Sequence, residues 1–109
     1  MTPHRGDVVW APGPFKDDGR SRPWLVLNTD RHPFGDEESI AATVTTTPHD
    51  EAIRLGDDAW RSGGAPRTSY VAPWSVTMLK HAVTEERQGR LKDGVVERVI
   101  DELVGYLGG

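Results

Sequence analysis

Two short polar segments of this chain carry side chains that suit chemistry on a phosphate group. Arg22 stands directly before the apolar run 23–28, so its base is fixed while its guanidinium can bind a phosphate or carboxylate. In the segment 43–47, strand alternation places the hydroxyl of Thr45 on one face with those of Thr43 and Thr47, where they can donate to phosphoryl oxygens. Each segment alone also fits a simpler interpretation, because surface arginines close loops and threonine favours strands.

A histidine and a tryptophan are further candidates for contact with a nucleic acid. His49 follows Thr45 by four residues and is the best placed of the four histidines for acid–base chemistry near neutral pH. The simpler interpretation of His49 is a loop residue without a role. Trp60 lies in the polar segment 56–68 and is predicted to be the exposed tryptophan, suited to stacking on a base or a partner. The other three are predicted to be core.

The elements that must hold these residues are short strands followed by a helix. Residues 56–68 are predicted to be a loop because glycine and proline interrupt them, and Pro73 predicts a bulge or an edge position. Apolar and β-branched runs predict strands over residues 7–11, 23–28, 39–47, about 52–55 and a long segment 70–83.

The end of the chain predicts one amphipathic helix. Apolar residues recur at helical spacing from Val96 to Leu107, Asp93 is the predicted N-cap, and Gly108 ends the helix. About five short strands and one helix predict a small barrel or half-barrel with the helix packed on its side.

Composition narrows the class of protein further. The 109 residues fit one domain, and the absence of cysteine excludes disulfides, thiolate zinc sites and a cysteine nucleophile. No apolar run has the length of a signal peptide or a membrane span, so we expect a cytoplasmic protein. The formal charge of −4, from 17 acidic and 13 basic residues, does not by itself indicate a nucleic-acid binder.

Three motifs in order resemble the MazF/PemK family of toxin endoribonucleases. They are RGDVVW at 5–10, RPWLVL at 22–27 and VTT at 44–46. Family members open with a G-D-hydrophobic-hydrophobic-W strand, continue with R-P and an apolar strand, and place a threonine at the end of the next strand. The long segment 69–83 and the final helix follow in the family's order, so the resemblance spans nearly the whole chain.

The resemblance implies a mainly β, SH3-like barrel with a C-terminal α-helix, as a single domain over residues 1–109. It implies a homodimeric, growth-inhibiting toxin of a type II toxin–antitoxin system that cleaves single-stranded RNA at specific sequences. No metal or other cofactor is expected. The 2′-hydroxyl is the nucleophile, and the ends are a 2′,3′-cyclic phosphate and a 5′-hydroxyl. The implied partners are the RNA, a cognate antitoxin whose acidic tail covers the active site, and operator DNA bound together with that antitoxin.

Residue roles follow from the same resemblance. The arginine of R-P falls on Arg22, which would stabilise the phosphorane charge and take part in proton transfer, and the strand-end threonine falls on Thr45, which would donate to a non-bridging oxygen. Asp17 stands where some members place an acidic residue that orients the arginine.

The residues expected to bind RNA must offset the net acidity of the chain, because each neutralised phosphate adds to affinity. A local basic patch is predicted from Lys16, Arg20 and Arg22, with Arg31 as a further member. The predicted RNA-binding set is Lys16, Arg20, Thr46, His49 and Trp60.

Two other functions remain open from the residues alone. One is a non-catalytic SH3-like module that binds nucleic acid or a protein. The other is a role in assembly, with the helix stripe as the contact surface and the barrel as scaffold.

Overall fold

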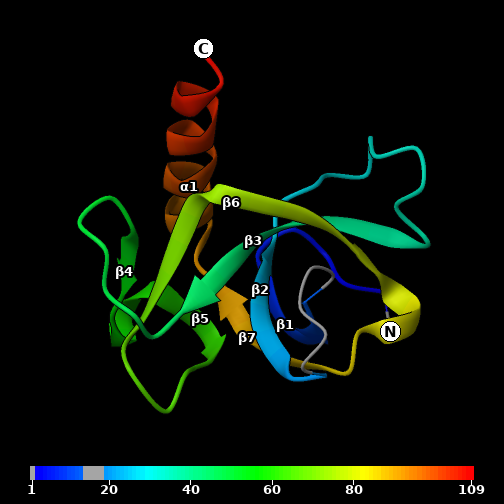
Figure 1. Ribbon diagram of the computed structural model, residues 1–109, viewed down its shortest axis with the longest axis horizontal. Helices are drawn as coiled ribbons and strands as arrows, with labels where there is room; N and C mark the ends of the chain where they lie inside the picture. The colour runs from blue at the N-terminus through cyan, green and yellow to red at the C-terminus, as the bar shows by residue number, and fades with distance from the viewer. Residues whose placement is uncertain (1, 14–18) are drawn as a thin grey trace.

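The computed structural model describes residues 2–13 and 19–109, and within them seven antiparallel strands form one sheet that curves into a nearly closed barrel (Figure 1). The strands are β1 (Asp7–Pro12), β2 (Ser21–Val26), β3 (Glu38–Thr45), β4 (Ile53–Leu55), β5 (Trp60–Gly63), β6 (Ser69–Lys80) and β7 (Glu86–Leu91), in the sheet order β4-β6-β3-β2-β1-β7-β5. Two short 3₁₀ helices, η1 (Asp57–Ala59) and η2 (His81–Val83), precede β5 and β7, and α1 (Asp93–Tyr106) ends the chain. The predicted fold class, mainly β with a C-terminal α-helix, is confirmed.

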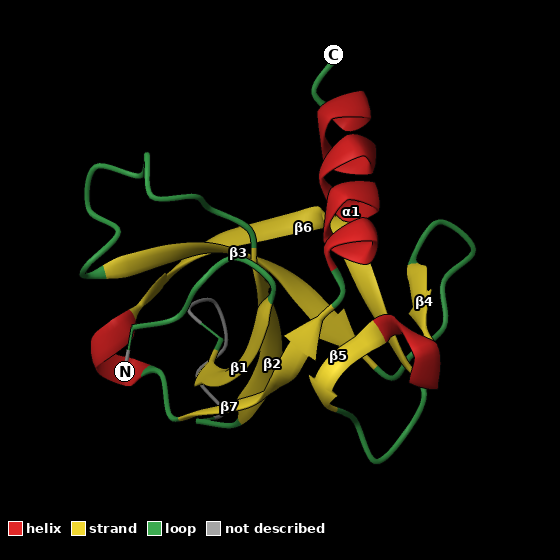
Figure 2. Ribbon diagram, turned by 180° about the vertical axis from the view of Figure 1, so that it is seen from behind, coloured by secondary structure: helices red, strands yellow, loops and turns green. Residues whose placement is uncertain are grey.

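The helix stands against the barrel and extends beyond it, as the two opposite views show (Figures 1 and 2). It begins one residue earlier than an N-cap at Asp93 would require, because Lys92 is the N-cap and Asp93 is the first helical residue. The Asp93 carboxylate instead pairs with Arg61 at 3.3 Å. The prediction for the other end is confirmed, since Gly108 takes a φ of +91° directly after the last turn. No helix in the described part of the chain is long and apolar enough to cross a membrane.

Two strands contradict the sequence prediction. The segment 56–68, predicted to be a loop, contains η1 and β5, and β7 was not predicted at all. Both strands are short on apolar residues, because β5 reads WRSG and β7 reads ERQGRL, and both expose much of their length. Their order comes from backbone pairing, of β7 with β1 and of β5 with β7, which no side-chain pattern reports.

The bulge predicted at Pro73 is confirmed. Val76 of β6 pairs with Ala42 of β3, whereas Ala72 pairs with Thr43, so residues 73–75 are left out of the ladder register with β3. The extra residues turn Trp74 outward, and its side chain is 42% exposed, which contradicts the prediction that it is core.

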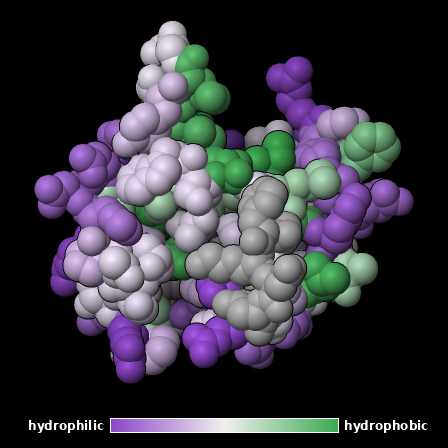
Figure 3. All heavy atoms as spheres, viewed as in Figure 1, coloured by the Kyte–Doolittle hydropathy of each residue, from purple (hydrophilic) through white to green (hydrophobic). Residues whose placement is uncertain are grey.

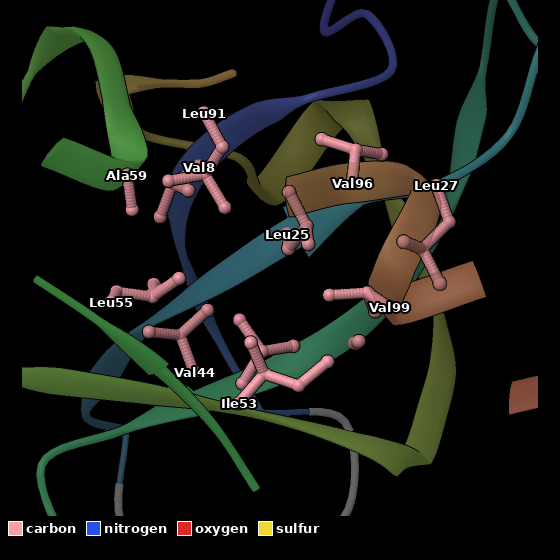
Figure 4. Close-up of a cluster of buried hydrophobic side chains, with 12 residues drawn as sticks. Val8, Leu25, Leu27, Val44, Ile53, Leu55, Ala59, Leu91, Val96 and Val99 are labelled. Carbon is pink, nitrogen blue, oxygen red and sulfur yellow. The ribbon is translucent and has the colours of Figure 1, made fainter. Parts of the chain in front are cut away.

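The larger core cluster lies between the barrel and the helix (Figure 4). It joins Val8, Leu25 and Leu91 of the barrel to Val96 and Val99 on the inner face of α1. A second cluster, of Val9, Ala11, Trp24, Val26, Ala41 and Leu79, lies on the other face of the same strands. The alternation of strand side chains therefore gives the central strands two buried faces, which is why their sequences are nearly continuous apolar runs.

Candidate active site

The register between β2 and β3 brings the two leading candidates together. Trp24 of β2 pairs with Thr43 of β3 in an antiparallel ladder. Continuing the same register by two residues on each strand places Arg22 opposite Thr45. Residues two apart share a face of the strand, and opposite residues have Cβ atoms about 5 Å apart. The arginine and the threonine, 23 residues apart in sequence, are thus neighbours in space.

Arg22 and Thr45 line one cavity of about 360 Å³. Its apolar lining comes from Trp10, Pro23, Val44, Ala65 and Pro66. Its polar lining comes from Arg22, Thr45, Thr46, Arg67, Ser69 and Gln88. The lining holds two guanidinium groups and no carboxylate, so among its described residues the cavity is cationic although the whole chain carries a charge of −4. Such a site suits a phosphate.

Local hydrogen bonds orient both leading side chains. The Thr45 Oγ1 accepts a hydrogen bond from the backbone N–H of Thr47 at 3.1 Å, which fixes the hydroxyl and leaves its own proton available for donation. The Arg22 Nη1 donates to the carbonyl oxygen of Arg20 at 3.4 Å. Arg22 and Thr45 are both half-buried, so ligand and solvent can reach them from the cavity.

The predicted RNA-binding residues divide between the cavity and other surfaces. Thr46 lines the cavity and is exposed. Arg20 is exposed beside Arg22, but its side chain is not part of the cavity lining. His49 is exposed after β3, packs edge-to-face on Trp74 with ring centroids 6.0 Å apart, and is not part of the cavity lining. Lys16 and Asp17 lie outside the described residues.

Two sequence predictions about basic and aromatic residues are corrected. Trp60 opens β5 and packs against the larger core cluster, so it is not an exposed loop residue. The Trp60 ring lies against Gly89 of β7, where a Cβ would be only 2.8 Å from the ring. Arg31 is not part of the patch around Arg22, because it lines a separate cavity at the other end of β2 with Arg5 and His32.

The structure adds cavity residues that the sequence did not indicate. Arg67 comes from the β5–β6 connection, Ser69 is the first residue of β6, and Gln88 belongs to β7. Nothing in their spacing relative to Arg22 or Thr45 marks them, because they join the site through the barrel closure. In the ranges 2–13 and 19–109, no three His, Asp or Glu side chains group as a metal site.

A larger cavity of about 620 Å³ lies at the opposite end of the barrel. Its lining mixes Arg5 and Arg90 with the carboxylates of Asp30 and Asp36. Acids and bases of similar number cancel there, so this cavity is a poorer phosphate site than the one that holds Arg22 and Thr45.

Comparison with known proteins defines the class. Residues 4–106 match the model of the PemK-like, MazF-like toxins of type II toxin–antitoxin systems, and the chain belongs to this family. The predicted family is therefore confirmed. No curated protein matches the chain.

Solved structures of the same fold are similar over nearly the whole chain. The MazE–MazF complex from Deinococcus radiodurans aligns with a TM-score of 0.79 at 20% identity, covering 99% of this chain and 98% of that one. An endoribonuclease in complex with its cognate antitoxin from a mycobacterial species aligns with a TM-score of 0.72 at 20% identity, covering 98% and 94%. The Mycobacterium tuberculosis toxin MazF-mt6 aligns with a TM-score of 0.67 at 18% identity, covering 92% and 93%.

Proposed function

We propose that this family member is a metal-independent endoribonuclease that cleaves single-stranded RNA in the cavity between Arg22 and Thr45. The observation that carries the proposal is the placement of a guanidinium and an oriented hydroxyl on one cavity whose described lining residues include two arginines and no carboxylate. Family membership and the endoribonuclease among the similar structures support the same activity.

The proposed reaction is an attack of the ribose 2′-hydroxyl on the adjacent phosphorus. The O2′–P bond forms, the P–O5′ bond breaks, the 2′-hydroxyl loses its proton, and O5′ gains one. Negative charge grows on the non-bridging oxygens, and the Arg22 guanidinium and the Thr45 hydroxyl stabilise it there. Arg22 also takes part in the proton transfer. The products are a 2′,3′-cyclic phosphate and a 5′-hydroxyl.

The net negative charge of the chain would by itself disfavour RNA binding, but the charge near the cavity is positive. Arg22 and Arg67 flank the cavity, whereas much of the acidic charge lies on other surfaces, such as Asp101 and Glu102 on the exposed face of α1. An RNA strand interacts most with the charges within about 8 Å at physiological salt. A negative chain can thus bind a phosphate backbone at one positive cavity.

The deciding experiment incubates the chelator-treated protein with RNA of mixed sequence and maps both ends of the fragments. We expect discrete fragments with 2′,3′-cyclic phosphate and 5′-hydroxyl ends. If the chelator-treated protein binds the RNA without cleaving it, the result would instead support the non-catalytic module. The variant Arg22→Ala serves as the control for contaminating ribonucleases, since cleavage that survives this change does not arise from the cavity.

We also propose a homodimer that forms through the apolar face shared by α1, β3 and β6. Exposed side chains of this face are Ile40, Trp74, Met78, Val104, Tyr106 and Leu107. Ile40 and Met78 are cross-strand partners, Trp74 contacts Tyr106 edge-to-face, and apolar surface runs down one side of the helix (Figure 3). Exposed apolar surface of this extent on a small chain marks an interaction site. The substitution Met78→Glu should shift the sedimenting species from dimer to monomer.

The remaining partners in the proposal are an antitoxin, operator DNA bound together with it, and a cytoplasmic RNA pool. Support comes from the similar complexes, in which a MazF chain is held with MazE and an endoribonuclease with its antitoxin. Co-expression with the product of a neighbouring short acidic reading frame tests this part, and the expected result is a stable complex that no longer cleaves RNA.

A further inference from the structure

We infer that Gln88 determines which base is accepted beside the cleaved phosphate. This role rests on the proposed function, because a base can be selected for cleavage only where an RNA strand is cut. Gln88 belongs to β7 and lines the same cavity as Arg22 and Thr45.

A β-bulge in β7 sets the direction of the Gln88 side chain. Val8 of β1 pairs with Gly89 of β7, whereas Val9 pairs with Arg87, so Gln88 is the extra residue between two consecutive pairs. An extra residue interrupts the alternation of the strand and turns its side chain away from the regular position. Bulges next to functional sites commonly serve this purpose. The bulge therefore gives β7 a side chain at the cavity that an unbroken strand would not place there.

The neighbouring backbone holds the bulge in place. A Cβ on Gly63, which has a φ of +67°, would lie 2.3 Å from the carbonyl oxygen of Gln88. A Cβ on Gly89 would lie 2.6 Å from the carbonyl oxygen of Ser62 and 2.8 Å from the Trp60 ring. All three distances are too short for real atoms, so the two glycines allow β5 to pack directly on β7. Gln88 thus projects from a closely packed support, which favours precise contact with a ligand.

The carboxamide is chemically suited to a base edge. It offers a donor and an acceptor side by side, and no described group of the protein hydrogen-bonds with it. Gln88 is half-buried, so its polar end is shielded but reachable from the cavity. A glutamine forms paired hydrogen bonds with a base such as adenine, and single-stranded RNA is read through splayed bases. Arg22 and Thr45 hold the phosphate, and Gln88 reads the base next to it.

The test compares cleavage-site profiles of the wild type, Gln88→Ala and Gln88→Met on one RNA pool of mixed sequence, with both ends mapped. Methionine keeps the volume of the side chain and removes both hydrogen-bonding groups. Glu86→Gln is the matched control, because Glu86 is exposed on the same strand and does not line the cavity. Thermal melts of all four proteins show whether the folded state is retained.

We expect the preference for the favoured base to fall about tenfold to a hundredfold in both Gln88 variants and to stay unchanged in Glu86→Gln. Cleavage at disfavoured sites should persist, since the phosphate-binding residues are intact. Folded Gln88 variants with the wild-type profile, or with an equal loss at every site, would overturn the inference while leaving the proposed function in place. A wild type that cuts no RNA would overturn the proposed function and this role together.

Discussion

The two ends of the barrel differ in how their charged side chains are arranged. At the end where β3 stops, Arg22 and Arg67 line a cavity that has no carboxylate among its described residues. At the end where β3 starts, the buried carboxylates are paired within the protein, although Arg5 and Arg31 line a cavity there. Glu38 there contacts Lys80 at 3.1 Å and His32 at 3.4 Å, with side-chain exposure of 11% for the glutamate.

Asp7 shows the same pairing at the start of β1. Its side chain is 5% exposed, accepts a hydrogen bond from the His4 backbone at 2.8 Å, and lies 3.5 Å from Arg87 and 3.4 Å from Arg90. This contrast between the two ends shows that the net charge of −4 does not describe the local charge that a ligand would meet. Paired charges contribute to stability at one end, whereas at the other end Arg22 and Arg67 line a cavity that suits an anionic ligand.

The largest effect should come from removing the guanidinium of the cavity. Arg22→Ala is expected to lower the rate of RNA cleavage about a thousandfold, because one preorganised donor to the transition state is lost. Arg31→Ala, at the opposite end, should stay within about twofold of the wild type, as changes outside a site usually do. Single-turnover kinetics on one RNA oligonucleotide measure both. Equal losses in the two variants would contradict the division between the ends.

A smaller loss is expected for the hydroxyl. Thr45→Val keeps the shape of the side chain and removes its donor, so cleavage should slow about tenfold to a hundredfold. Thr45→Ser retains the donor and should recover most of the rate. The same kinetic assay compares the pair, and a valine variant as active as the wild type would remove Thr45 from the site.

Changes at the end where Asp7 and Glu38 are paired should alter the free energy of unfolding. Asp7→Ala is expected to lower the free energy of unfolding by about 2 kcal/mol, because the charge-assisted hydrogen bond to His4 is lost and the attraction to two half-exposed arginines adds little more. Arg67→Ala should change it by less than about 0.5 kcal/mol. Urea unfolding followed by tryptophan fluorescence measures both, and a reversed order would show that the cavity arginine has a structural role.

The smallest effect concerns salt. Binding of single-stranded RNA should weaken as salt rises, and Arg67→Gln should reduce the slope of log K against log salt by about 0.7, the value for one phosphate contact. Arg31→Gln should leave the slope unchanged. Binding titrations at several salt concentrations, in the Arg22→Ala background to prevent cleavage, give the slopes. An unchanged slope in Arg67→Gln places this residue outside the path of the strand.

Local patterns predicted the strands with apolar or β-branched runs, the bulge at Pro73 and the C-terminal helix. They failed for β5 and β7, whose residues are polar or glycine and whose order depends on pairing with distant strands. They also failed for Trp60 and Trp74, because the exposure of a residue depends on the elements packed around it. Trp60 lies in β5 and packs against the larger core cluster, whereas the bulge in β6 leaves Trp74 exposed.

The amino-acid sequence alone determined the family, the barrel class and the identities of Arg22 and Thr45 as a pair of interest, because these depend on ordered local motifs. Only the tertiary structure decided that the two residues line one cavity, since the antiparallel register of β2 and β3 relates positions far apart in the chain. It also decided that Arg67 and Gln88 join them and that Arg31 does not. Closure of a barrel brings strands from both halves of the chain to one cavity, and no local spacing records that closure.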